Sequence, residues 1–107
     1  MELQELRAVY YALADDIRLK ILKLLYDYNE LCVCQLQPVL NISQPNLSFH
    51  LRILRDSNLV NLKKEGKWSY YSLNKENEIL KANLDFIKNL KIQENLDLNA
   101  CQIEFKK

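Results

Sequence analysis

The sequence predicts a small, mainly α-helical domain that carries one β-hairpin. Apolar residues recur at intervals of three and four along most of the chain, which is the period of amphipathic helices. Around the single glycine, Gly66, the pattern changes to alternation, which is typical of two strands and a tight turn. The chain has 107 residues, of which 49% are hydrophobic, enough for one modest core. We expect one domain over residues 1–98 and a tail over residues 99–107.

The composition excludes several other classes of protein. No apolar run reaches the length of a membrane span, and the acidic, polar start Met-Glu-Leu-Gln-Glu is unlike a signal peptide. The three cysteines form an odd set, and in a reducing compartment they are expected as thiols. We therefore expect a soluble cytoplasmic protein with no membrane partner.

The first two predicted helices lie before residue 29. The apolar positions of the first helix are Leu3, Leu6, Tyr10 and Leu13. The apolar positions of the second helix are Ile17, Ile21, Leu24 and Leu25. Asp15 or Asp16 can cap the second helix, because a carboxylate accepts hydrogen bonds from the unpaired amides of a helix start.

A short third helix is predicted from the cysteine stretch LCVCQLQ through Leu40. Cys32 stands where a helix start prefers Ser, Thr, Asp or Asn, and Gln35 suits the reciprocal position of a capping box. A thiol is a poor cap, and the loss is on the order of 0.5–2 kcal/mol. This cost suggests that the thiol has a functional role.

The fourth helix and the hairpin follow. Ser43 is a good N-cap, Pro45 falls in the first turn, and Asn58 suits a left-handed residue after the last turn. The buried stripe of this helix is predicted to be Leu47, Leu51 and Leu54. The stretch LVNLKKEGKWSYYSL then predicts two strands joined at Glu65-Gly66, where glycine supplies a positive φ.

A long last helix is predicted from Glu76 to about Leu98. Two short helices followed by a basic hairpin make a winged helix-turn-helix. The terminal helices carry more apolar surface than so small a domain can cover. We therefore expect a homodimer through the terminal helices.

Positive charge is concentrated in the middle of the chain. Residues 43–75 hold six basic and two acidic residues, whereas residues 1–42 hold four basic and six acidic ones. A basic segment within a nearly neutral chain is expected of a surface that meets phosphates. Double-stranded DNA is therefore the expected partner of the helix-turn-helix and its hairpin.

The candidate DNA-binding residues lie on the fourth helix and in the hairpin: Gln44, Asn46, Ser48, Phe49, His50, Arg52, Lys63, Lys64 and Lys67. Arginine can pair with guanine or phosphate, Asn and Gln with adenine or phosphate, and Phe with a thymine methyl group. His50 borders the buried stripe, so a structural histidine is at least as well supported as a phosphate contact. The lysines would equally suit a solvated turn.

The stretches ELCVCQL, ISQPNLSFHLRILRDSNLV and KKEGKWSYYSL, in this order, resemble the ArsR/SmtB family of metal-sensing repressors, and within it the arsenic-responsive branch. The resemblance extends from about Arg7 to Ile87. It implies a homodimer on pseudo-palindromic operator DNA, which needs no cofactor to bind and which is not an enzyme. It further implies that trivalent arsenic or antimony acts as the inducer by binding the cysteines.

Cys32 and Cys34 are the candidate ligands, since thiolates suit thiophilic ions and a helix N-terminus favours the thiolate form. In a regular helix, side chains two residues apart diverge by about 200°. Two thiolates can share one ion only if the backbone at this turn is non-helical or is pulled out of the helix. We therefore expect binding to unwind or re-aim the start of the third helix.

The third ligand stays open at this point. The family pattern often has a third cysteine where this chain has Gln37. Cys101 in the tail, a small cellular thiol or a solvent oxygen could complete the site.

Other functions remain as alternatives. One is a thiol redox sensor, and another is a sensor of cadmium, lead or bismuth. A small thiol oxidoreductase is less well supported, because the single histidine lies on the expected DNA-reading helix and the chain has no glycine-rich loop. The operator, the regulated genes and the ranking of these ions are left open by the sequence.

Overall fold

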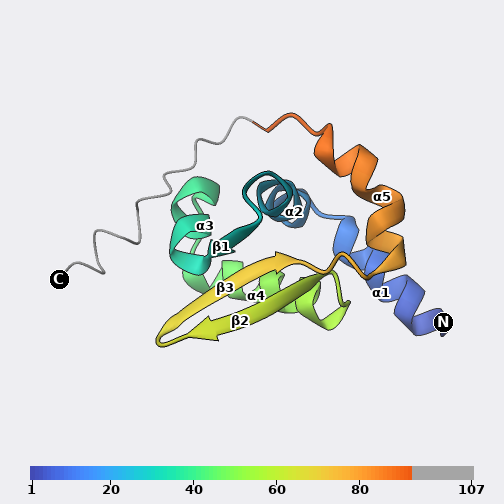
Figure 1. Ribbon diagram of the computed structural model, residues 1–107, viewed down its shortest axis with the longest axis horizontal. Helices are drawn as coiled ribbons and strands as arrows, with labels where there is room; N and C mark the ends of the chain where they lie inside the picture. The colour runs from blue at the N-terminus through green and yellow to red at the C-terminus, as the bar shows by residue number, and fades with distance from the viewer. Residues whose placement is uncertain (93–107) are drawn as a thin grey trace.

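The computed structural model describes residues 1–92 (Figure 1). Its elements, in chain order, are α1 (Leu3–Leu13), α2 (Asp16–Tyr28), β1 (Glu30–Cys32), α3 (Val33–Leu40), α4 (Gln44–Asp56), β2 (Val60–Glu65), β3 (Trp68–Leu73) and α5 (Glu78–Lys88). The predicted order of four helices, a hairpin and a helix is confirmed, with one strand added. The expected tail, and Cys101 within it, lie outside the described residues.

The predicted caps and turns are confirmed. The Asp15 carboxylate accepts from the Arg18 backbone N–H at 3.1 Å, and the Ser43 hydroxyl accepts from the Asn46 N–H at 3.2 Å. Asn58 and Gly66 both have positive φ values, 63° and 60°. Each of these residues satisfies a local backbone requirement, so each could be recognised from the sequence.

The sheet has a third strand that the sequence analysis did not predict. All pairs are antiparallel and the strand order is β1-β3-β2, with Cys32 opposite Tyr70 and Lys63 opposite Tyr70 on the other side. Three residues are too few to show an alternating pattern. Strand β1 forms because its backbone pairs with β3, some 40 residues away in sequence, as the register Leu31–Tyr71 shows.

The core lies around α2, which Figure 1 shows between the terminal helices and the helix-turn-helix. The predicted stripe of α4, Leu47, Leu51 and Leu54, is buried. Fully buried side chains also come from α2, α3 and α5, among them Ile21, Leu22, Leu25, Leu36 and Leu80. Each such side chain contributes about 1.5–3 kcal/mol to the free energy of unfolding, so this burial holds α4 against the core.

The predicted length of the last helix is wrong. Helix α5 runs Glu78–Lys88 rather than from Glu76 to about Leu98, and residues 89–92 are not helical. At the start, the Asn77 side chain accepts from the N–H groups of Ile79 and Leu80, so the helix begins after it. At the end, the Lys23 ammonium donates to the Lys88 carbonyl at 2.7 Å. A side chain of α2 thus satisfies a terminal carbonyl that a longer helix would have bonded internally.

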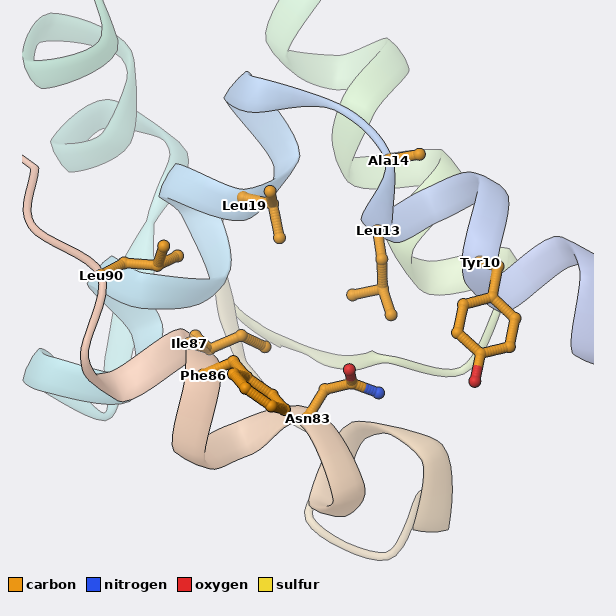
Figure 2. Close-up of a pocket in the computed structure, with 8 residues that line it drawn as sticks. All are labelled: Tyr10, Leu13, Ala14, Leu19, Asn83, Phe86, Ile87 and Leu90. Carbon is orange, nitrogen blue, oxygen red and sulfur yellow. The ribbon is translucent and has the colours of Figure 1, made fainter.

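Helices α1 and α5, together with Leu19 of α2, line an open apolar hollow of about 320 Å³ (Figure 2). Leu13 and Tyr10 from α1 face Ile87 and Phe86 from α5 across it. Phe86 is 75% exposed. An exposed apolar face of this kind is where the sequence placed a dimer contact, and the homodimer stays a prediction. Among the helices of residues 1–92, none combines the length and the apolar character that a membrane span requires.

Candidate thiol site and nucleic-acid interface

The sulfurs of Cys32 and Cys34 converge at the start of α3. Cys32 ends strand β1 and is the N-cap of α3, with the extended angles φ −92° and ψ 166°. Because Cys32 is not helical, the divergence of a regular helix does not apply, and the two Sγ atoms lie 2.7 Å apart. The backbone is already non-helical at this turn, so the geometric reason for expecting α3 to unwind is removed.

The turn that holds the sulfurs is stabilised in the predicted way. The Gln35 side-chain oxygen accepts from the Cys32 N–H at 2.9 Å, which is the reciprocal bond of a capping box. Cys32 is only 2% exposed, whereas Cys34 is half-buried. One sulfur is therefore held in the core and the other reaches the surface.

Two of the predicted ion ligands, Cys32 and Cys34, lie within the described residues. Within residues 1–92 there is no group of three or more His, Cys, Asp or Glu side chains that could hold a metal ion. Trivalent arsenic with three sulfurs therefore fits this part of the chain incompletely. Cys101, one of the third donors that the sequence left open, lies outside the described residues.

A surface hollow of about 530 Å³ connects the thiol site with the helix-turn-helix and the hairpin. Cys34 and Gln37 of α3 line it, as do Gln44 and Ser48 of α4 and Lys67 of the hairpin turn. Three of the predicted DNA-binding residues thus share a cavity with a predicted ion ligand. Sequence spacing alone could not show this, because the hairpin packs beside α3 through the sheet.

Most of the predicted DNA-binding residues of α4 lie on its exposed face. Gln44, Asn46, Ser48 and Arg52 are exposed, and Phe49 is 43% exposed. They lie opposite the buried leucine stripe, as the helical period predicted. The helix therefore presents a mixed polar, basic and aromatic surface of the kind that enters a major groove.

His50 lies in the interior rather than on this face, and its contact with DNA stays a prediction beside the structural alternative. It is 7% exposed, and its Nδ1 lies 3.0 Å from Nη1 of Arg18. Burial lowers the pKa of His50, the Asp15 carboxylate opposes this, and the Arg18 charge lowers it further. The structure thus supports the structural alternative for this residue.

Arg18 is a buried residue that was not among the candidates predicted from the sequence. It is 4% exposed, its Nε donates to the Ala12 carbonyl at 2.8 Å, and its Nη2 donates to the Tyr11 carbonyl at 3.0 Å. A signal was present, because Arg18 falls three and four positions before the buried Ile21 and Leu22. A basic residue in the apolar stripe of a helix requires buried partners.

The three hairpin lysines are exposed but differ in their contacts. Lys63 forms ion pairs with Glu30 at 3.3 Å and Glu65 at 3.9 Å, and the hydrogen bond to Glu30 raises its pKa. The ammonium group of Lys67 lies 5.7 Å from the centre of the Trp68 ring. Lys63 therefore links β2 to β1 across β3, and its charge is paired with two carboxylates.

A helix-turn-helix with an exposed polar second helix and a basic hairpin defines a winged-helix regulator. Residues 15–61 match the family described as "Bacterial regulatory protein, arsR family". An arsenical resistance operon repressor of Staphylococcus xylosus is 41% identical over 88 residues, which cover 81% of this chain and 84% of that protein. The chain belongs to the ArsR family.

Other relatives and solved structures agree with this family assignment. An arsenical resistance operon repressor of Bacillus subtilis is 45% identical over 67 residues, and the match spans 63% of this chain and just under two thirds, 64%, of that repressor. HlyU from Vibrio cholerae superposes with a TM-score of 0.72 at 37% identity, covering 87% of this chain and 100% of HlyU. The structure of reduced HlyU superposes with a TM-score of 0.71, also at 37% identity, and the match covers 84% of this chain and 92% of the HlyU chain. These likenesses confirm the predicted fold and the family resemblance.

Proposed function

We propose that the protein is a transcriptional repressor that binds operator DNA as a homodimer and leaves it when trivalent arsenic or antimony binds Cys32 and Cys34. One observation carries the proposal. The two sulfurs lie 2.7 Å apart at the start of the first helix of the helix-turn-helix. Relatives named as arsenical resistance operon repressors support the choice of ion.

The DNA-binding surface consists of α4 and the hairpin. Arg52 pairs with phosphate or a guanine edge, and Asn46 and Gln44 bind adenine or phosphate. Phe49 meets a thymine methyl group, and Ser48 a backbone or base edge. Lys64 and Lys67 add phosphate contacts from the hairpin, with Lys63 in a smaller role because of its ion pairs.

Two copies are needed to read a pseudo-palindromic operator. The exposed Phe86 and Tyr10 beside the apolar hollow of α1 and α5 provide a face that a second copy covers (Figure 2). The two copies of α4 must then lie about 34–36 Å apart, one turn of DNA. Any shift of α4 relative to α1 changes this spacing and weakens binding.

Cys32 and Cys34 would hold the ion, with the third donor from Cys101, a small thiol or solvent. Each of the two thiolate sulfurs would bind the same ion, which would thereby link Cys32 to Cys34. Cys32 caps α3 and pairs with Tyr70 of β3, so a displacement of this residue reaches both the helix-turn-helix and the hairpin. A coupling of roughly 1–3 kcal/mol between ion and operator suffices for a 5–150-fold change in affinity.

A fluorescence-anisotropy titration tests the proposal. A duplex selected by the protein from a random pool serves as operator, and arsenite is added to the complex. We expect the wild type to release the duplex, and Cys32→Ser and Cys34→Ser to bind it without responding to arsenite. An unchanged affinity of the wild type in arsenite would refute the sensing function.

A thiol redox sensor is the second candidate. The short distance between the sulfurs and the likeness to HlyU, which has been solved in a reduced form, favour it. Release of the duplex by peroxide but not by arsenite would select this function. Cadmium, lead and bismuth are tested in the same titration.

A further inference from the structure

The Arg18 side chain joins three helices through one buried guanidinium group. Nε and Nη2 donate to the carbonyls of Ala12 and Tyr11 at the end of α1, and Nη1 lies within hydrogen-bond distance of His50 in α4. The ring of Tyr11 lies 4.9 Å below the guanidinium. Carbonyls at a helix C-terminus carry partial negative charge, so they stabilise the buried cation.

We propose that Arg18 is a positioning residue for operator binding, which fixes the recognition helix α4 to the end of α1 through His50. The inference rests on the proposed operator-binding function and assigns a role to a residue that touches no DNA. The planar guanidinium holds its donors at set angles, so three bonds from one group fix both neighbours together. A lysine could not replace this arrangement.

His50 connects this contact to the DNA-binding face. Its ring meets the ring of the neighbouring Phe49 edge to face, with 5.4 Å between centroids and 67° between planes. Phe49 is exposed among the predicted base contacts. The bond to Arg18 therefore holds the rotation of α4 about its axis, and with it the direction of Phe49.

Helix α1 connects the same contact to the expected dimer face. Tyr10 and Leu13 line the apolar hollow, and the Tyr11 and Ala12 carbonyls between them accept from Arg18. One side chain thus relates the helix that pairs with a second copy to the helix that reads DNA. Loss of this contact would leave the fold but relax the spacing of the two recognition helices.

The contact requires a neutral imidazole. Arginine only donates, so Nδ1 of His50 must accept, and the ring proton lies on Nε2. The charged groups that face His50 are Arg18 and Asp15, and the Asp15 carboxylate lies 3.7 Å from Nδ1. The ring of Tyr11 in α1 packs against the Arg18 guanidinium. Protonation of Nδ1 turns this acceptor into a donor, which repels the N–H groups of Arg18. The protonated Nδ1–H is then attracted to the Asp15 carboxylate. Acid should therefore release α4 from Arg18.

Three variants test the proposal in operator titrations between pH 5.5 and 8. We expect Arg18→Lys to weaken operator binding about tenfold at pH 7.5, the loss of one hydrogen bond to a charged group. His50→Asn should bind nearly as the wild type does, because its amide oxygen can accept in the place of Nδ1, and should lose the fall in affinity at acid pH. Arg55→Lys, exposed in the last turn of α4, is the matched control and should not change the affinity.

Hydrogen exchange without DNA separates this inference from the proposed function. Arg18→Lys should exchange faster than the wild type at the α4 amides, with circular dichroism showing a folded protein. Wild-type affinity of Arg18→Lys, or a wild-type pH profile of His50→Asn, overturns the positioning role while leaving operator binding intact. If no duplex binds the wild type, the proposed function fails. Hydrogen exchange then tests the inference alone, and an unchanged exchange rate of the α4 amides in Arg18→Lys overturns the link between α1 and α4.

Discussion

The sulfurs of Cys32 and Cys34 lie 2.7 Å apart although one residue is extended and the other helical. The junction of β1 and α3 brings them together, because an extended N-cap turns its side chain toward the first helical turn. Strand β1 holds this N-cap by pairing Cys32 with Tyr70. The paired site therefore depends on a strand contact as well as on the motif.

X-ray absorption of the arsenite-loaded protein should count the ligands. We expect three sulfurs around arsenic in the wild type and two sulfurs with one oxygen in Cys101→Ser, both in buffer without added thiol. The expectation follows from the Cys32–Cys34 pair and from the absence, within residues 1–92, of a group of three or more His, Cys, Asp or Glu side chains that could hold a metal ion. Three sulfurs in Cys101→Ser would contradict a role for Cys101, and fewer than two in the wild type would contradict the site.

Gln37→Cys in the Cys101→Ser background should restore the third sulfur. Cys34 and Gln37 are three residues apart on α3 and line the same hollow, so their side chains are neighbours. We expect arsenite to release the duplex at a lower concentration than in Cys101→Ser alone. Val39→Cys, also on α3 but away from the lining of the hollow, is the control and should bring no gain.

The free energy of unfolding should decrease when the pH falls below the ordinary pKa of histidine. Burial lowers the pKa of His50 in the folded protein, so between this pKa and about 6.5 the unfolded state binds more protons. The free energy of unfolding then decreases as the pH falls through this window and levels off below the folded pKa. Urea denaturation at pH 5.5 and 7.5 should show this difference in the wild type but not in His50→Asn.

The hairpin lysines should differ in their effect on DNA binding. Lys67→Gln should reduce the slope of log affinity against log salt by about 0.9, the value for one phosphate contact. Lys63→Gln should reduce it less, because Lys63 is paired with Glu30 and Glu65. Anisotropy titrations over a range of salt concentrations measure both slopes. Equal slopes for the two variants would show that the ion pairs of Lys63 open on DNA.

Local features were recognised from the sequence because local chemistry decides them. The cap residues Asp15 and Ser43, the turn at Gly66 and the leucine stripe of α4 all follow from near neighbours and helical period. The winged helix-turn-helix followed from the order of these elements. The cysteine pair and its capping partner Gln35 were also readable, since three residues of spacing define a capping box.

Contacts between distant segments had no such signal. Strand β1 forms by pairing with β3, and the Lys23 side chain binds the carbonyl at the end of α5. The contact with Arg18 holds the His50 ring in the interior. The helical period placed His50 at the border between the buried stripe and the exposed face of α4. The contact with the buried Arg18 of α2 then decided that His50 lies on the buried side.

The sequence by itself determined the order of the helix-turn-helix and the hairpin, the buried leucine stripe of α4, and that two cysteines stand at a helix start. Tertiary structure alone decided that the two sulfurs converge, that Cys34 shares a hollow with Gln44, Ser48 and Lys67, and that an arginine joins α1 to α4. The physical reason is that helix periods and caps act over a few residues. The pairing of β1 with β3 and the partners of a buried charge arise only when the chain has packed.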